Sequence, residues 1–228
     1  RQTELNDMKS RFISVVSEAL KKKLAFILSS AELLKHYGDR LPEPEKAEVI
    51  GTIETGVQRM TQMLDRVLLL GKVEAQMLEF KPAQINLKTL CQNLVEDARI
   101  QHSEAMCELT LEFEARPAVG VFDEKLLRHI FGNLLSNAIK YSPQGGTVLF
   151  RVFSLDARVG FEVADQGIGI PAEELPHLFE WFHRASNVGE IQGTGLGLAI
   201  VKNSVDLHGG SIEVASQVGH GTRFIVKI

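Results

Sequence analysis

The sequence predicts an α+β protein in which an antiparallel hairpin of two long helices precedes an α/β sandwich. Apolar residues recur at helical spacing through the first third of the chain, and this pattern breaks near Leu78. Helical and strand-like segments then follow in mixed order. We therefore expect a helical hairpin over 1–78, a linker over 79–84 and a second domain over 85–228.

Two apolar stripes, each with intervals of three or four residues, predict the helices of the first domain. The first stripe comprises Leu5, Met8, Phe12, Val16, Leu20, Leu24, Ile27, Ala31 and Leu34. The second stripe comprises Val49, Ile53, Val57, Met60, Leu64, Val67 and Gly71. Gly38 suits the end of the first helix and Pro44 suits the first turn of the second, so a short turn joins them.

A lone hairpin leaves both stripes half covered. A homodimer would cover them by forming a four-helix bundle from two chains, and this is the arrangement we expect. The alternative is that the second domain covers the stripes within one chain, and the stripes themselves leave that alternative open.

The second domain combines helical periodicity with short alternating segments. We expect helices over 85–101, 123–141 and 200–207. We expect strands over 109–113, 147–153, 159–164, 211–215 and 222–228. Helices and antiparallel strands in this order indicate a sheet with helices on one side.

Composition excludes several classes of protein. The 228 residues are 44% hydrophobic and 24% charged, as in ordinary globular proteins rather than disordered chains. The net charge of −4 argues against nucleic acid or an acidic membrane surface as the main partner. Cys91 and Cys107 cannot form a disulfide framework and have no zinc-type spacing, which favours a reducing compartment.

The sequence also bears on location. No apolar run approaches ~20 residues, so we expect no membrane contact by this segment. The chain starts at Arg1 without an initiator Met or a signal-peptide pattern. We therefore expect a cytoplasmic segment, the soluble part of a longer protein whose upstream sensor domain lies outside this sequence.

Three short motifs provide the candidate chemistry. The first, Asp-Gln-Gly-Ile-Gly over 165–169, directly follows a predicted strand. The Asp165 carboxylate can accept a hydrogen bond from an exocyclic amine such as that of adenine, and Gly167 and Gly169 allow the backbone to turn tightly against a ligand. By itself, such a turn also fits a plain loop.

The second motif precedes a predicted helix and is rich in glycine. Its residues are Gly193, Thr194, Gly195, Leu196 and Gly197. Glycines before a helix N-terminus expose amide donors and the positive end of the helix dipole to phosphates. The motif is not a Walker loop, because no Gly-Lys-Ser/Thr follows.

The third motif lies on the predicted helix over 123–141. Asn133 and Asn137 are four residues apart and share a helix face. Two amide oxygens on one face can ligate a hydrated Mg²⁺ that bridges phosphates, and Lys140 is near enough in sequence to add a cation. Alone, this motif also fits an asparagine-rich helix end.

Together, the motifs resemble the catalytic ATP-binding domain of sensor histidine kinases. Asn-x-x-x-Asn-Ala-x-Lys-Tyr, Asp-x-Gly-x-Gly-Ile, Leu-Phe-Glu-x-Phe-x-Arg and Gly-Thr-Gly-Leu-Gly-Leu resemble the family's N, G1, F and G2 boxes, in that order. The ending Gly-His-Gly-Thr-Arg-Phe over 219–224 is similar to the family as well. The helical hairpin resembles the family's dimerisation and phosphotransfer domain.

The resemblance implies a Bergerat α/β sandwich that binds ATP and Mg²⁺. By this resemblance Asp165 would hold adenine, while Asn133 and Asn137 would serve Mg²⁺ and phosphate. Lys140 and Tyr141 would lie beside the nucleotide, and the glycines of the second motif would flank the phosphates.

The resemblance also implies a mobile lid between Pro171 and Gly193. Phe179 and Phe182 would pack this lid, and Arg184 completes the family's F box within it.

The sequence departs from the family at the acceptor box. After Phe-x-x-x-x-Ser the family has His-Glu-Leu/Phe-Arg-Thr-Pro-Leu, whose His accepts the phosphoryl group. Here Glu18 occupies the position of that His, and Ala19 replaces the acid that would take the imidazole proton. Lys22 and Lys23 replace the Thr and the helix-bending Pro, and none of the seven histidines lies in this box.

The altered box, Glu-Ala-Leu-Lys-Lys-Lys-Leu, has the composition of an idealised helix. This concentration of changes in one window suggests deliberate replacement. A naturally degenerate kinase is the alternative.

We therefore expect the core of a two-component sensor histidine kinase. Such a kinase transfers the γ-phosphoryl group of ATP to a His and then to an Asp on the receiver domain of a response regulator. This chain would keep the nucleotide machinery without the acceptor, so we expect no self-phosphorylation. A non-catalytic, nucleotide-binding dimeric scaffold is the rival hypothesis. The helical hairpin and the N box disfavour a topoisomerase or chaperone of the same superfamily.

Overall fold

The computed structural model describes residues 2–74, 79–156, 158–189, 191 and 193–228. The chain divides into two compact units, 1–78 and 79–228. Residues 75–78, which include the end of the predicted first domain, lie outside the described part. In the part of the chain that is described, no helix is both long enough and apolar enough to cross a membrane.

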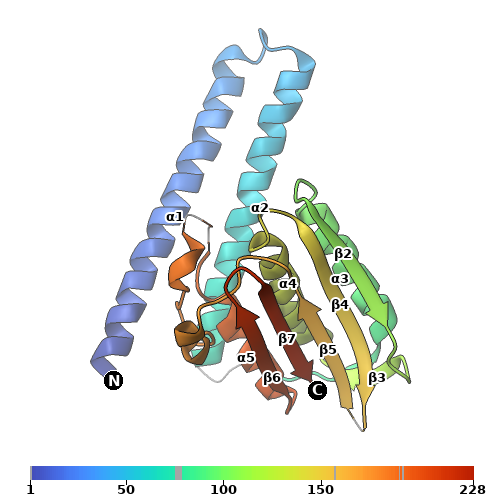
Figure 1. Cartoon of the computed structure of the whole chain (residues 1–228). Helices are drawn as coiled ribbons and strands as arrows, with labels where there is room; N and C mark the ends of the chain where they lie inside the picture. Colours follow the sequence, from blue (N-terminus) through green and yellow to red (C-terminus); the bar gives the residue numbers. More distant parts are fainter. Residues whose placement is uncertain (1, 75–78, 157, 190, 192) are drawn as a thin grey trace. The chain divides into compact units, whose positions relative to one another are not determined.

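The first unit consists of α1 (Gln2–Tyr37) and α2 (Glu43–Glu74), joined by a short turn (Figure 1). α1 runs without interruption through the altered box, as its helix-like composition indicates, and the predicted helical hairpin is confirmed. The chain leaves α1 at Gly38, where a Cβ would lie 2.3 Å from the carbonyl oxygen of Leu34. Glycine is therefore required at this helix end.

The two helices approach each other closely where Gly56 of α2 faces Ile27 of α1. A Cβ on Gly56 would lie 2.8 Å from Cγ1 of Ile27, so the glycine makes room for the isoleucine. Large apolar side chains remain exposed along the described part of the hairpin: Leu24, Phe26, Leu28, Leu33, Ile50, Val57 and Leu64. The hairpin thus leaves apolar surface uncovered, including members of both predicted stripes.

The second unit is built on a five-stranded sheet with the strand order β2-β4-β5-β7-β6. Its strands are β2 (Cys107–Phe113), β4 (Gly146–Leu155), β5 (Arg158–Ala164), β6 (Ser211–Gln217) and β7 (Gly221–Lys227). A separate two-stranded sheet pairs β1 (Ala83–Asn86) with β3 (Val119–Phe122). β1 begins inside the segment 79–84 that the sequence predicts to be a linker.

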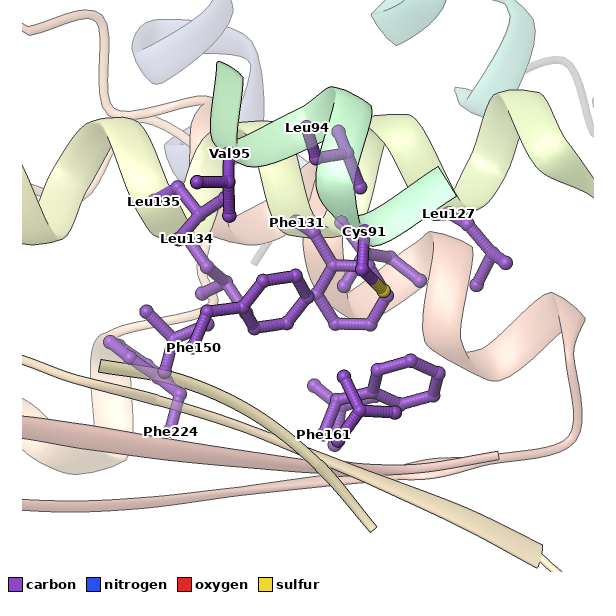
Figure 2. Packing of buried hydrophobic residues seen from close by; sticks show 14 of the residues in the cluster. Cys91, Leu94, Val95, Leu127, Phe131, Leu134, Leu135, Phe150, Phe161 and Phe224 are labelled. Carbon is purple, nitrogen blue, oxygen red and sulfur yellow. The ribbon is translucent and has the colours of Figure 1, made fainter. Parts of the chain in front are cut away.

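Three helices cover one face of the five-stranded sheet and give the predicted α/β sandwich (Figure 1). They are α3 (Leu87–Gln101), α4 (Glu124–Lys140) and α5 (Gly197–Leu207). In the core, the ring of Phe131 on α4 lies 5.2 Å from the ring of Phe150 and 4.5 Å from that of Phe161 (Figure 2). This packing fixes α4 on the sheet, and with it the polar residues on the other face of the helix.

The sheet differs from the sequence-based expectation in two respects. β2 pairs with β4 in parallel rather than antiparallel, because β3 and α4 lie between them in the chain and supply the crossover. The sequence does not indicate β1 and β3, because each has only four residues and Gly120 interrupts β3.

Candidate functional site

The end of α4 supplies the first group of candidate residues. Asn133, Asn137 and Lys140 lie on α4, and Tyr141 is its C-cap. The helix begins at Asp123, whose Oδ1 accepts a hydrogen bond from the backbone N–H three residues on, at 3.1 Å. The apolar face of α4 is buried against the sheet, which leaves both asparagines half-buried on the opposite face.

Asp165 follows β5 directly and is held by two backbone donors. Its Oδ1 accepts hydrogen bonds from Gly167 N at 2.9 Å and from Thr222 N at 3.1 Å. Within the described residues both hydrogen bonds to its carboxylate end on Oδ1, which leaves Oδ2 available to a ligand. Burial raises the pKa of this carboxyl group, while the two backbone hydrogen bonds act in the opposite direction.

The glycines after Asp165 allow two close backbone approaches. A Cβ on Gly167 would lie 2.1 Å from the carbonyl oxygen of Tyr141, and Gly169 has a φ of +67° beside the Gln217 carbonyl. Ile168 N donates a hydrogen bond to the same Tyr141 carbonyl at 2.9 Å. The loop after β5 is thereby joined to the end of α4.

The second glycine-rich segment contacts both the predicted lid and α4. Gly195 has a φ of +69°, and its carbonyl accepts a hydrogen bond from Phe182 N at 3.0 Å. A Cβ on Gly197, the first residue of α5, would lie 3.0 Å from Oδ1 of Asn133. Between these glycines Leu196 is buried, and its N–H is 3.4 Å from Oγ1 of Thr194.

The orientation of the Asn133 amide follows from one hydrogen bond. Its Nδ2 donates to the carbonyl oxygen of His129 at 2.7 Å, one turn back along α4. Oδ1 therefore points to the start of α5, near Gly197. Asn137 lies one turn further along the same helix. The amide oxygen of Asn133 is thus presented beside the glycine-rich segment.

A cationic cluster lies beside Gly193. A Cβ on this glycine would lie 3.0 Å from Nζ of Lys140 and 3.9 Å from Nε of Arg184. The Lys140 ammonium is 4.8 Å from the centre of the Tyr141 ring and 3.5 Å from its hydroxyl. Burial raises the pKa of Tyr141, and the charge of Arg184 opposes that shift.

The predicted lid contains two short 3₁₀ helices, η1 (Ala172–His177) and η2 (Ser186–Val188). Glu174 of η1 accepts a hydrogen bond from Ser186 N at 3.2 Å, and its Oε2 lies 3.0 Å from Nε2 of His183. The hydrogen bonds from Ser186 are the main cause that lowers the pKa of Glu174.

The other predicted lid residues differ in their contacts. Phe179 packs against the core, and Arg184 donates a hydrogen bond to the carbonyl oxygen of Ile191 at 2.6 Å. Residues 190 and 192 of the predicted lid lie outside the described part.

The structure thus brings together the helix end, the two glycine-rich loops and the lid. It also adds residues to which sequence analysis gave no role. Thr222 binds Asp165 through its backbone N–H, and Ser216 contacts the Thr222 hydroxyl at 2.8 Å. The Gly-His-Gly-Thr run over 219–222 was the available signal for Thr222.

Comparison with protein families gives two matches. The family described as Histidine kinase-, DNA gyrase B-, and HSP90-like ATPase matches residues 122–228. The His Kinase A (phospho-acceptor) domain matches residues 8–76. The chain is a homologue of the sensor histidine kinases. The first match includes every predicted nucleotide-site residue, and the second includes position 18.

Individual relatives of this histidine kinase homologue align with the chain across both matched regions. Drug sensory protein A of Synechocystis sp. is 33% identical over 98% of the chain and 35% of the relative. The circadian input-output histidine kinase CikA of Synechococcus elongatus is 36% identical over 98% of the chain and 30% of the relative. The chain therefore spans about a third of the length of these curated relatives.

Solved structures share the fold of this histidine kinase homologue. Full-length ShkA in complex with AMPPNP aligns with a TM-score of 0.68 and 25% identity, over 96% of this chain and 45% of that one. The Acinetobacter baumannii histidine kinase AdeS aligns with a TM-score of 0.68 and 20% identity, over 92% of this chain and 96% of that one.

Proposed function

We propose that the second unit binds ATP with Mg²⁺ and that the chain is the core of a two-component histidine kinase without its own acceptor. The observation that carries this proposal is the convergence of Asp165, the end of α4 and the segment 193–197 on one site. In this proposal Oδ2 of Asp165 accepts a hydrogen bond from the exocyclic amine of adenine. The family match supports an ATP site in this unit.

The phosphates are assigned to the start of α5. This helix begins at Gly197 without a side-chain cap, so its first amide groups can donate to phosphate oxygens. Lys140 and Arg184 add positive charge beside Gly193. The site therefore combines backbone donors with side-chain cations, which together suit a nucleoside triphosphate.

Mg²⁺ is assigned to the asparagines of α4. The described residues include no cluster of His, Cys, Asp or Glu that could hold a metal ion, so a metal here would depend on amide, phosphate and water oxygens. Mg²⁺ accepts this set of ligands and usually keeps several waters. Asn133 fits because its Nδ2 is already engaged and its Oδ1 accepts no hydrogen bond from the described residues. Asn137 would be the second ligand. When bound, the ion neutralises charge on the phosphates.

Two partners are proposed, a second copy of the chain and a response regulator. We propose a homodimer through residues 5–78, because the hairpin leaves large apolar side chains exposed. Analytical ultracentrifugation at micromolar concentration should give a dimer, and a monomer would reject this assignment. The final phosphoryl acceptor would be an Asp on the receiver domain of a response regulator.

We propose that Glu18 does not replace the family's acceptor histidine. A carboxylate can in principle accept a phosphoryl group, but Glu18 lacks the ring geometry and the reach of an imidazole. The kinase activity would therefore act on a partner chain with an intact box. A nucleotide-binding scaffold without phosphotransfer is the second candidate, and Glu18 itself favours it.

The two candidates are separated by rebuilding the family box. The combined changes Glu18→His, Ala19→Glu, Lys21→Arg, Lys22→Thr and Lys23→Pro restore it, with Leu20 kept. We expect labelled ATP to give acid-labile phosphate on the restored chain and none on the present chain. Asp165→Asn in the restored chain is the matched control and should leave little labelling when the ATP concentration is near the dissociation constant of the unaltered site.

Mixed dimers complete the test. The present chain is combined with a restored chain that also has Asp165→Asn, so that the nucleotide site and the acceptor lie on different chains. Labelling in the mixture indicates transfer between chains, whereas an unlabelled mixture beside a labelled restored homodimer indicates transfer within a chain. ATP binding without labelling in either experiment would establish the scaffold function instead.

A further inference from the structure

Phe182 of the predicted lid has a backbone conformation that phenylalanine rarely adopts. Its φ is +67°, in the left-handed region that favours glycine. Among the described residues other than glycine, only Asp156 shares a positive φ, and it lies in the turn between β4 and β5, where aspartate tolerates this conformation. Phe182 is therefore a point of backbone strain in the second unit.

A tight turn accompanies this conformation. His183 N donates a hydrogen bond to the carbonyl oxygen of Glu180 at 3.4 Å, which places Phe182 third in a turn of four residues. Turns with a positive φ at the third position ordinarily have glycine or asparagine there. In the left-handed region, the Cβ atom lies too close to the following carbonyl oxygen. The strain thus depends on the Cβ atom, and alanine at this position would keep it.

Gly195 holds Phe182 in its strained conformation. Phe182 N donates a hydrogen bond to the carbonyl oxygen of Gly195 at 3.0 Å. The two backbones also touch, because a Cβ on Gly195 would lie 2.6 Å from the carbonyl carbon of Phe182. Gly195 belongs to the glycine-rich segment 193–197. A strained residue of the lid is thus fastened to this segment through its own backbone.

The neighbouring contacts show which part of the lid depends on this bond. Phe179 packs against the core, so the lid is anchored just before the turn. Among the backbone hydrogen bonds of the described residues, the one between Phe182 and Gly195 alone joins the segment 180–189 to residues outside the lid. The side chain of the exposed Asn187 makes one further hydrogen bond, to the loop after β5. Opening of this segment therefore requires the bond between Phe182 and Gly195 to break.

We propose that the bond between Phe182 and Gly195 is a strained latch, which closes the lid on the glycine-rich segment and whose strain favours opening and nucleotide release. This inference rests on the proposed ATP site and specifies how that site is regulated. The closed lid contains the strain, whereas the open lid allows Phe182 to take an ordinary φ. The strain therefore lowers the stability of the closed lid relative to the open one and raises the rate at which nucleotide leaves.

The test compares two variants that both lack the phenyl ring. Phe182→Gly accepts a φ of +67° without strain, whereas Phe182→Ala keeps the strain. We expect the closed lid to be roughly fivefold more favoured in Phe182→Gly, because relief of strain exceeds the extra freedom of glycine in the open lid. Phe182→Asn should lie between the two, since asparagine enters the left-handed region more readily than alanine.

Two measurements follow the lid. Hydrogen exchange by NMR gives the protection factor of the amide at position 182 in the chain without nucleotide. Stopped-flow fluorescence gives the rate at which methylanthraniloyl-ADP leaves in the presence of Mg²⁺. Relative to Phe182→Ala, Phe182→Gly should raise the protection factor and slow the release, each by roughly fivefold.

Two controls isolate the strain. Ala185→Gly compares the same two side chains three residues further on, at an ordinary φ of −59°. With no strain to relieve, this change should speed opening slightly through the freedom of glycine. Adding Gly195→Ala to each Phe182 variant removes the space that the latch needs. The difference between Phe182→Gly and Phe182→Ala should then disappear.

The outcomes separate this inference from the proposed function. If Phe182→Gly is no better protected than Phe182→Ala, the strained latch is wrong. If the protection factors differ as expected but the release rates are equal, the latch does not control nucleotide release. If the unaltered chain and all variants fail to bind the fluorescent ADP, the proposed ATP site falls together with the role in release, while the exchange data still decide the latch.

Discussion

Asp165 obtains both its orientation and its raised pKa from its immediate surroundings. Two backbone N–H groups bind Oδ1 and fix the carboxylate at the end of β5, while burial penalises its ionised form. An amide of the same shape would keep one oxygen and exchange the other for a donor. Asp165→Asn therefore tests the hydrogen-bonding role of this residue with little change in packing.

The first prediction is that Asp165→Asn weakens ATP binding by roughly 30- to 100-fold, the size expected when a hydrogen bond to a charged group is lost. The asparagine Oδ1 can still accept from Gly167 N and Thr222 N, so Nδ2 would face the adenine amine as a second donor. Calorimetry measures the affinity, and thermal melting checks the fold. Unchanged affinity would reject the adenine assignment.

The second prediction concerns pH. Burial raises the pKa of Asp165 above that of an ordinary Asp, so its carboxyl group gains its proton at a higher pH. Protonation turns an acceptor into a donor, and ATP affinity should fall as the pH decreases through that raised pKa. Stability has the opposite sign, because ionising a buried carboxyl group costs stability as the pH rises through the same pKa. The Asp165→Asn variant has no carboxyl group at this position, so this contribution to the pH dependence of ATP affinity and of stability should be absent.

At the scale of elements, α4 connects the start of the second unit with the candidate site. Asp123 caps the helix and also accepts a hydrogen bond from Lys81 N through Oδ2 at 2.8 Å. Its backbone N–H donates to Nε2 of His208, which follows α5, and the ring of Phe80 packs edge-on against His208 at 5.0 Å. One buried carboxylate thus joins the chain entering this unit to the helix whose far end bears Asn133 and Lys140.

The third prediction is that Asp123→Ala lowers the free energy of unfolding of the second unit by about 2 kcal/mol. Loss of a helix cap contributes about 1 kcal/mol, and the stranded Lys81 N–H contributes a similar amount. Urea unfolding followed by the fluorescence of Trp181, the one tryptophan of the chain, reports on this unit. The control is Glu104→Ala at an exposed position, which should leave the urea midpoint unchanged. If Asp123→Ala also unfolds at the midpoint of the unaltered chain, the capping role is wrong.

Sequence patterns predict some of these features and not others, for identifiable physical reasons. The helical period of Leu127, Phe131 and Leu134 marks the buried face of α4, and local turn chemistry marks Gly167. By contrast, the hydrogen bond between Asp165 and Thr222 depends on the register of β5 against β7, in which Ala164, the residue before Asp165, pairs with Arg223, the residue after Thr222. Such non-local register leaves no periodic signal within either segment.

At the scale of the whole molecule, the altered box changes the mechanics of the first unit as well as its chemistry. α1 is a single helix from Gln2 to Tyr37, and Lys23 lies well inside it. A proline there would remove the backbone hydrogen bond to position 19 and press its ring against that carbonyl, at a cost of about 3 kcal/mol. The hairpin of the present chain should therefore be stiffer than one with the family's proline.

The fourth prediction is that Lys23→Pro lowers the melting temperature of the first unit while leaving the second unit unaffected. Far-UV circular dichroism follows the helices of both units, whereas Trp181 fluorescence follows the second unit alone, so the two transitions can be assigned separately. Lys23→Ala is the matched control: it removes the same side chain but keeps the backbone hydrogen bond, and it should melt like the present chain or slightly higher. Chain concentration must be equal in all three samples, because the melting temperature of a dimer depends on it. If Lys23→Pro melts as high as Lys23→Ala, the helix already bends at this point without cost, and the stiffening by the altered box is wrong.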